Sequence, residues 1–509
     1  MNAHYTITTS ARTNKYILVA TGVLVALTTG VSAQTSDPLL NVLIKKGILT
    51  EKEAQNIKTE ADTNQTNNIA PISALKWKLS EGIKSIELFG DIRLRYEYRT
   101  AQAPTDGRIE LKRYRYALRF GLRGDLADNF YYGFRLETAA NPRSPWVSFG
   151  TSSSGTPYQG PFGKSTAGIN VGQAYLGWRA ASWLDITVGK MPNPLFTTPM
   201  VWDGDLNPDG AAEHFKYTVG QADLFANFGQ FLYQDVNPAN AAPGLVSGLP
   251  FGQGASSPFL LAWQAGANYH LDKDISFKAA VTLYDYLGMG QNNSTAPTRV
   301  PGFSDPFVGN GAPTIGVNTG PNSDGFFFNQ TGINDLLILE IPFQVDFKIS
   351  RFNARVFGDL AQNLEGGKRA TAAAGASAAQ GFPFAAQKNE NQAYQIGFAI
   401  GNRDSLGLVY GTVAKKGMWE ARAYWQHIEQ YALDPNLLDS DFFEGRANLE
   451  GIYSAFAYSF TDNMIGSLRY GYANRINNQL GTGGSNQDIP QVNPVQHFQI
   501  FQMDLTYRF

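Results

Sequence analysis

Residues 113–123 read RYRYALRFGLR, and the order of these letters decides the fold class. Arginine occupies positions 113, 115, 119 and 123, and aromatic or aliphatic residues stand between them. Successive residues of an α-helix are about 100° apart, so a helix would spread these arginines around its whole surface. A β-strand would collect them on one face. The stretch therefore predicts a strand with one basic face and one apolar face.

The same period of two appears in 84–99 and 496–509, and further segments bring the number of predicted strands to sixteen. Long connections alternate with tight turns of one to three residues, such as Lys415–Gly417. Outer-membrane barrels have this layout, with every long loop at one end. Residues 84–509 are therefore expected to form an all-β fold, a transmembrane antiparallel β-barrel of about sixteen strands.

The segment 391–414 is the uncertain part of this strand count. It is too long for one simple strand, and Asn402–Ser405 resembles a turn. If this segment is one bulged or extended strand, the barrel has sixteen strands. If it is a hairpin, the count becomes seventeen, and a barrel of eighteen strands would require one further strand elsewhere.

The arginines are expected to face the barrel interior, because an arginine facing lipid at the membrane midplane costs about 2–4 kcal/mol. The aromatic residues between them would then face the membrane, with tyrosines at its two interfaces. We predict a basic wall lining the pore, formed by Arg93, Arg95, Arg113, Arg115, Arg119 and Arg135.

The third long connection, 192–210, and the start of the predicted strand after it contain the acidic sequence WDGDLNPDGAAE at 202–213. Three interpretations are open. Asp205, Asn207 and Asp209 match half of a calcium loop, although Lys216 stands where that motif requires glutamate. A plain surface loop is the second interpretation. The third is a constriction loop that enters the barrel and sets its acids against the arginines; these acids are Asp203, Asp205, Asp209 and Glu213.

The first 83 residues differ from the rest of the chain. Arg12 and Lys15 precede the apolar run 16–27, and Val31–Ala33 offers a small-residue cleavage site, so 1–33 are interpreted as a signal peptide. Two short helices and a polar linker are expected over 34–83, as a periplasmic helical segment. The net charge of −2 gives no reason to expect nucleic acid as a partner. The absence of cysteine excludes zinc–thiolate sites, and we expect no cofactor and no metal besides the calcium alternative.

Several motifs resemble those of the putative porin family of Gram-negative outer membranes, which is distantly similar to phosphate-selective porins. They are the helical opening DPLLNVLIKKGILTEKEAQNI, the strands GDIRLRYEYR and RYRYALRFGLRGDLADN, the loop VGKMPNPLF with VWDGDLNPDGAA, and the terminal DLTYRF. The resemblance implies a passive diffusion channel that forms a homotrimer in outer-membrane lipid. It also implies a barrel-assembly machinery that recognises the terminal Tyr507 and Phe509. The lumenal rows contain few lysines and several acids, which departs from the phosphate-specific pattern.

We therefore expect an outer-membrane porin for small hydrophilic solutes or ions, with mild charge selectivity and no enzymatic activity. One alternative is a barrel enzyme that hydrolyses lipids or peptides, for which His427 with Glu429 is the only local hint. The other alternative is an adhesin-like structural barrel that uses the long connection 288–332 to contact a partner.

Overall fold

The computed structural model describes Thr50 and residues 80–104, 107–139, 143–150, 168–233, 258–287, 335–379, 385–483, 488–489 and 492–509. The chain divides into two units, Met1–Leu79 and Ser80–Phe509. The predicted signal peptide and nearly all of the predicted helical segment 34–83 lie outside the described residues. All strands of the described residues belong to the second unit.

The second unit is a closed antiparallel barrel. Its strands are β1 (Glu87–Gln102), β2 (Arg108–Asp125), β3 (Phe130–Ala139), β4 (Val147–Ser148), β5 (Gly168–Ala181), β6 (Leu184–Lys190), β7 (Asp209–Val219), β8 (Ala222–Leu232), β9 (Phe259–His270), β10 (Ser276–Leu287), β11 (Leu337–Ile349), β12 (Phe352–Asn363), β13 (Gln392–Asn402), β14 (Trp419–Ile428), β15 (Leu449–Ser459), β16 (Met464–Arg475) and β17 (His497–Arg508). Apart from β4, each strand pairs with its neighbours along the chain, so that β3 pairs with β5, and β17 closes the sheet by pairing with β1. The two-residue β4 adds only a short pairing to β2, and the other sixteen of the seventeen strands go around the barrel. The predicted fold class is confirmed.

The two faces of the wall follow the period of two. On β15, Ile452, Phe456 and Tyr458 are exposed, whereas Tyr453 and Ala455 between them are buried. Exposed apolar side chains on the outer face suit contact with lipid, and polar side chains are collected inside.

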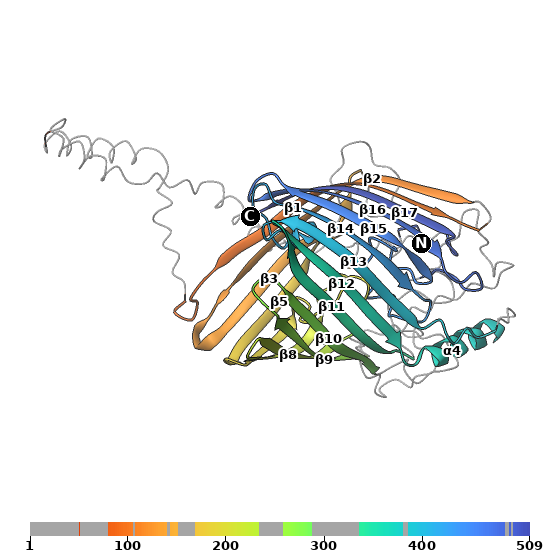
Figure 1. The fold of residues 1–509 in the computed structure, drawn as a ribbon, viewed down its shortest axis with the longest axis horizontal. Coiled ribbons are helices and arrows are strands. Elements are labelled where there is room, and N and C mark those ends of the chain that lie inside the picture. The colour runs from red at the N-terminus through yellow and green to blue at the C-terminus, as the bar shows by residue number, and fades with distance from the viewer. Residues whose placement is uncertain are drawn as a thin grey trace, which may run out of the picture. The chain divides into compact units, whose positions relative to one another are not determined.

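Most long connections lie at one end of the barrel and most short ones at the other, and residues 403–418 form a long connection at the end with the short ones. We call the end with short connections the turn end; it includes Ser182–Trp183, Gly220–Gln221 and Ser350–Arg351. The other end is the loop end, and one of its connections contains the helix α4 (Gly366–Ala379). Figure 1 shows α4 beyond one end of the strands and the C-terminus at the other. Among the described residues, no helix has the length and apolar composition to cross a bilayer.

The expected extended strand 391–414 is wrong, because β13 ends at Asn402. Residues 403–418, here called the turn-end segment, form an irregular connection with one turn of 3₁₀-helix at Leu408–Tyr410. Gly407 (φ 111°) and Gly411 (φ 69°) adopt left-handed backbone conformations, which a regular strand does not contain. Leu408 is buried, so the alternation that suggested a strand reflects packing of an inward-folded turn.

The interior contains packed apolar side chains as well as charges. We call residues 191–208 loop 3, residues 429–448 loop 7 and residues 476–496 loop 8. Met200 and Trp202 of loop 3 and Phe442 of loop 7 belong to one buried cluster with inward-facing wall residues such as Tyr424. The ring centroids of Tyr424 and Phe442 are 5.9 Å apart. Long loops therefore fold into the barrel and pack against its inner wall.

The C-terminus completes the closure of the barrel at the turn end. Phe509 exchanges two backbone hydrogen bonds with Gly90, of 3.0 and 3.1 Å. A Cβ atom added at Gly90 would lie 2.7 Å from the Phe509 Cζ atom, so the ring needs the glycine beneath it. Tyr507 is exposed on the outer face and pairs with Ile92 of β1.

Deleting Phe509, or the substitution Phe509→Asp, should reduce the yield of folded barrel severalfold, because the deletion removes the last backbone pairing at the β1–β17 seam and the substitution replaces the ring against Gly90 with a charge. The measurement is the heat-modifiable band in outer-membrane fractions on gel electrophoresis. Tyr507→Phe keeps an aromatic side chain and serves as the control. An unchanged yield from the Phe509 deletion would contradict the expected role.

Candidate functional site

The inner face of β1 and β2 carries a row of arginines interleaved with acids. The β1–β2 register places Arg95 beside Arg115 and Asp91 beside Arg119. It also places Glu97 beside Arg113, an ion pair of 2.5 Å. Adjacent strands present paired residues on the same face, so these side chains form one continuous charged surface.

Three loops that are distant in sequence each bring one aspartate to this surface. Asp205 of loop 3 forms an ion pair with Arg119. Asp441 of loop 7 accepts a hydrogen bond from Arg95 Nη1 at 3.0 Å. Asp488 of loop 8 accepts one from Arg113 Nη1 at 2.9 Å.

Solvent reaches these aspartates more than it reaches their arginine partners. The side chains of Asp205, Asp441 and Asp488 are 23 %, 27 % and 26 % exposed. Those of Arg95 and Arg99 are 3 % and 1 % exposed. The solvent-accessible part of this charged surface is therefore lined mainly by loop carboxylates, with the guanidinium groups behind them.

The deepest charges of this surface are paired within the wall. Glu97 is fully buried and lies 3.0 Å from Arg99 Nε. Asp504 of β17 binds Arg95 at 2.7 Å and also pairs with Arg469 of β16. Removing one partner of such a buried pair leaves an uncompensated charge, which typically costs about 3–5 kcal/mol. These groups therefore fix the shape of the wall.

Trp146, from the second long connection, covers the middle of the arginine row. The Arg95 guanidinium carbon lies 4.0 Å from the indole centroid. The Trp146 carbonyl accepts a hydrogen bond of 3.3 Å from Arg115 Nη2. Glu97 is 3.7 Å from Arg115, so the contact of Arg115 with a carboxylate is longer than the 2.7 Å contact of Arg95 with Asp504.

The remaining predicted arginines lie toward the turn end. Arg93 binds Asp91 at 2.6 Å, and Arg135 lies 3.0 Å from Glu137. A hollow of about 290 Å³ opens at this end; its basic lining residues are Arg119, Arg123, Arg135 and Arg508.

Loop 3 crosses the interior from the arginine row to the opposite wall. Its Phe196 N donates to Gln264 of β9 at 2.9 Å. The hydroxyl groups of Thr197 and Thr198 donate to Glu340 of β11 and Asp359 of β12, each at 2.5 Å. The loop is thus held at both sides of the barrel.

Loops 3 and 7 also bind one another. The Asp203 carboxylate accepts a hydrogen bond from Ser440 N at 3.1 Å, and Asp203 N donates to the Leu437 carbonyl at 2.6 Å. Burial and the neighbouring Asp205 raise the pKa of Asp203. Burial, followed by repulsion from Asp441, raises the pKa of Asp439 to about 7. Although burial opposes it, attraction to Arg95 and Arg99 lowers the pKa of Asp441 to about 2.

Two of the predicted constriction acids lie outside loop 3. The loop ends at Pro208, and Asp209 begins β7, where it is 53 % exposed and pairs with Lys190. Glu213 shares a face of β7 with the exposed Tyr217, so it points outward, and Gln230 donates to it at 2.9 Å. Asp209 was assigned to the loop because the predicted connection ended at 210, whereas β7 begins at Asp209, and Glu213 was grouped with the loop acids although it lay beyond that connection.

The calcium alternative finds no support in the geometry. Asp205 is bound by Arg119, Asp209 by Lys190, and the Asn207 side-chain oxygen accepts a hydrogen bond of 3.0 Å from Gln173. Within the described ranges, no three His, Cys, Asp or Glu residues are grouped as metal ligands would be.

The turn-end segment is anchored inside the barrel. Glu420 Oε2 of β14 accepts hydrogen bonds from Gly407 N and Val409 N, at 2.8 and 3.0 Å. Arg469 donates to the Val409 carbonyl at 2.9 Å, and Arg508 donates to the Gly411 carbonyl.

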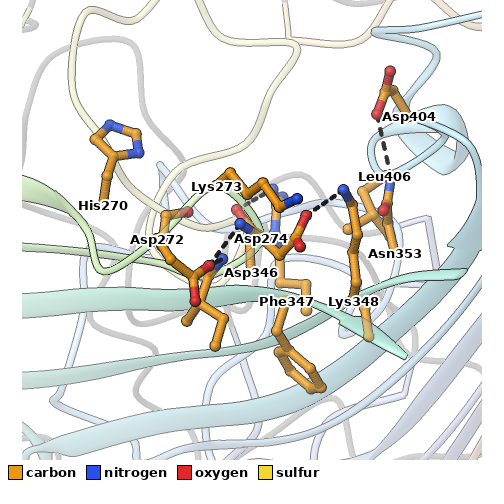
Figure 2. Close-up of a pocket in the computed structure, with 14 residues that line it drawn as sticks. His270, Asp272, Lys273, Asp274, Asp346, Phe347, Lys348, Asn353, Asp404 and Leu406 are labelled. Atoms are coloured by element: carbon orange, nitrogen blue, oxygen red, sulfur yellow. Dashed lines mark hydrogen bonds and ion pairs between the residues drawn. The ribbon is translucent and has the colours of Figure 1, made fainter. Parts of the chain in front are cut away.

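A second hollow of about 300 Å³ lies on the other side of the turn-end segment. Asp404 and Leu406 of the segment line it, whereas Ala414 lines the arginine-rich hollow. Figure 2 shows Lys348 pointing toward Asp274, with which it forms an ion pair, and Asn353 beside Asp404. The segment therefore borders both hollows at this end.

His427, the only hint of hydrolase chemistry, lies among structural contacts. Its ring stacks on Tyr394 with centroids 4.6 Å apart, and its Nδ1 is 2.8 Å from Glu450. Glu429 is 3.6 Å from the Nε2 atom. His427 shares its face of β14 with the exposed Trp425, so it belongs to the outer face.

The comparisons with known proteins agree with this architecture. The family profile described as "Putative porin" matches residues 100–509. The chain belongs to the putative porin family. No curated protein sequence matches this porin significantly.

Several solved outer-membrane proteins resemble this porin at low identity. In-vitro folded OmpT, an outer membrane protein of Vibrio cholerae, is 11 % identical over 85 % of this chain and 99 % of its own, with a TM-score of 0.38. OprB of Pseudomonas putida is 10 % identical over 84 % of this chain and 94 % of its own, with a TM-score of 0.44. OpdQ of Pseudomonas aeruginosa is 10 % identical over 84 % of this chain and 99 % of its own, with a TM-score of 0.38.

Glu420→Ala should release the turn-end segment of this porin, because it removes two hydrogen bonds from backbone N–H groups to a carboxylate. Bonds to charged groups contribute about 1.5–3 kcal/mol each. Trypsin added from the turn side should then cleave faster after Arg403, Lys415 or Lys416. Glu87→Ala is the matched control, because Glu87 forms an exposed pair with Arg123 at the same end and such pairs contribute about 0–1 kcal/mol. Equal cleavage rates in the two variants would contradict the anchoring role.

Proposed function

We propose that the protein is a passive diffusion channel for small hydrophilic solutes or ions, with a mild preference for one sign of charge. Membership of a porin family supports an outer-membrane channel. The observation that carries the finer proposal is the charged surface between loop aspartates and the arginine row. Opposed charges along a narrow polar route act on every ion that passes.

The preference should be mild because the two signs of charge nearly compensate. Arginines outnumber acids on the inner faces of β1–β3, whereas Asp205, Asp441 and Asp488 offset much of the excess. Charges within about 8 Å, the Debye length in physiological salt, still interact with a passing ion. The arginine excess on the wall favours anions and the more exposed loop carboxylates oppose it, so the net preference for anions is slight.

The turn-end segment adds a second narrowing to this proposal. It borders both hollows at the turn end and is bound to the wall through Glu420, Arg469 and Arg508. A solute would then pass the loop aspartates first and the turn-end segment second.

The family and the outward position of His427 favour a channel over a hydrolase. The adhesin alternative rested on 288–332, which lie outside the described residues. The signal peptide, the periplasmic N-terminal segment, the homotrimer and the assembly machinery stay predictions from the sequence.

The double variant Arg115→Gln/Arg119→Gln should shift the reversal potential in a KCl gradient toward cations, because two positive charges leave the inner wall. Planar-bilayer recordings measure the shift. Arg108→Gln/Lys112→Gln removes two exposed cations from the opposite face of β2, which also carries the exposed Tyr114, and serves as the matched control. An identical reversal potential in wild type and the inner double variant would show that the wall does not tune passage.

The triple variant Asp205→Asn/Asp441→Asn/Asp488→Asn should shift selectivity the other way, toward anions. Its conductance should also change, because the carboxylates that hold the loops on the arginines are gone. Asp209→Asn is the matched control, since Asp209 lies outside loop 3. A shift of the same size from the control would refute the assignment of the three loop aspartates.

A further inference from the structure

Two carboxyl groups are buried together on the inner wall opposite the arginine row. Glu340 of β11 and Asp359 of β12 are both fully buried. Glu340 is in register with Ala361, two residues from Asp359 on the same face of β12. The adjacent residues Thr197 and Thr198 of loop 3 bind one carboxyl each, which places the two carboxyls beside one another.

The groups that face this pair are almost all neutral. Tyr284 of β10 donates to Glu340 Oε2 at 2.7 Å, and it is the titratable side chain among them. Thr282 of β10 and Gln264 of β9 are hydrogen-bonded to each other at 2.7 Å beside the pair. From β13, Gln395 is in register with Asp359. Among the ion pairs formed by the described residues, none joins Glu340 or Asp359 to Lys, Arg or His.

Among the described residues, the contacts to the pair from outside the wall come from loop 3. Thr197 and Thr198 each donate a hydroxyl hydrogen bond to one of the two carboxyls. Two carboxylates that share a dry site without a cation do not both ionise, because each disfavours the charge of the other. The pair therefore holds at least one proton while it binds the loop.

We propose that Glu340 and Asp359 share this proton and act as the positioning pair for loop 3, so that pH controls the geometry of the channel. When the last shared proton passes to bulk water, two adjacent buried charges face hydroxyl donors and no cation among the described residues. The wall then takes up water and releases Thr197 and Thr198.

The consequence for passage rests on the proposed function as a channel. Pro199 comes directly after the two threonines, and its carbonyl accepts a hydrogen bond from Asp439 N of loop 7. Asp205, which faces Arg119, lies a few residues farther along the same loop. Release at the pair therefore loosens the loop that carries an aspartate of the solvent-accessible charged surface.

The experiment compares single-channel recordings over a range from acid to alkaline pH. Wild type should pass from steady current to fluctuation between conductance levels as pH rises. The variant Glu340→Gln/Asp359→Asn keeps hydrogen-bonding side chains but cannot ionise, so its current should stay steady at every pH. Persistence of the wild-type pH response in this variant would overturn the proposal.

Asp439→Asn is the matched control, because Asp439 of loop 7 is also titratable and its backbone N–H donates to the Pro199 carbonyl of loop 3. Its pKa of about 7 reflects burial and the nearby Asp441. The alkaline response should persist in Asp439→Asn. If it disappears there and persists in the Glu340→Gln/Asp359→Asn variant, the contact between loops 3 and 7 is the sensor and the proposal fails.

A second readout does not need conduction. The chain contains no cysteine, so Phe196→Cys can carry a single spin label next to the two threonines. The label should become more mobile at alkaline pH in the wild-type background and stay immobile beside Glu340→Gln/Asp359→Asn. A label at Ser182→Cys, in a turn-end connection, should not respond. If the label becomes mobile at alkaline pH in a protein that does not conduct, the channel function is refuted and the positioning pair is supported. If the mobility of the label does not depend on pH, the positioning pair is refuted.

Discussion

The structure depends on the cost of leaving a guanidinium group without a partner. Lipid excludes the arginines of β1 and β2 from the outer face, and the barrel interior accepts them only where acids compensate their charge. The wall supplies some of these acids, such as Glu97 and Asp504. The loops supply the others, because Asp205, Asp441 and Asp488 all bind the same row. Inward folding of three loops thus results from the need to pair the charges of two strands.

Loop 3 is held by two different kinds of interaction at its two sides. Toward the arginine row, Asp205 is fixed by opposite charge, which salt and nearby carboxylates weaken. Toward β11 and β12, Thr197 and Thr198 bind two carboxyls that have no cation, so this contact depends on a proton. A loop attached in both ways responds to ionic strength at one side and to pH at the other.

The places where sequence reasoning failed have a common physical cause. The turn-end segment repeats Leu406, Leu408 and Tyr410 at strand spacing, yet its left-handed glycines and buried Leu408 belong to a folded turn. Asp209 looked like a loop acid because β7 begins before the predicted end of the loop, and Glu213 was grouped with it as the next acid along the chain. A period of two shows that residues alternate between two environments, and it does not show where the pairing of backbone groups begins or ends.

The sequence by itself determined the closed barrel, its sixteen long strands and the face of each strand that carries charge, because these depend on local alternation and the cost of charge in lipid. Arg469 and Asp504 also lie on inward positions of that alternation, so their place in the wall could be found from the sequence. Only the tertiary structure decided which acids meet which arginines. Arg95 and Asp441 are separated by 346 positions, and Arg119 and Asp205 by 86. No local pattern encodes such contacts, because they arise only when closure of the barrel brings the loops into one interior.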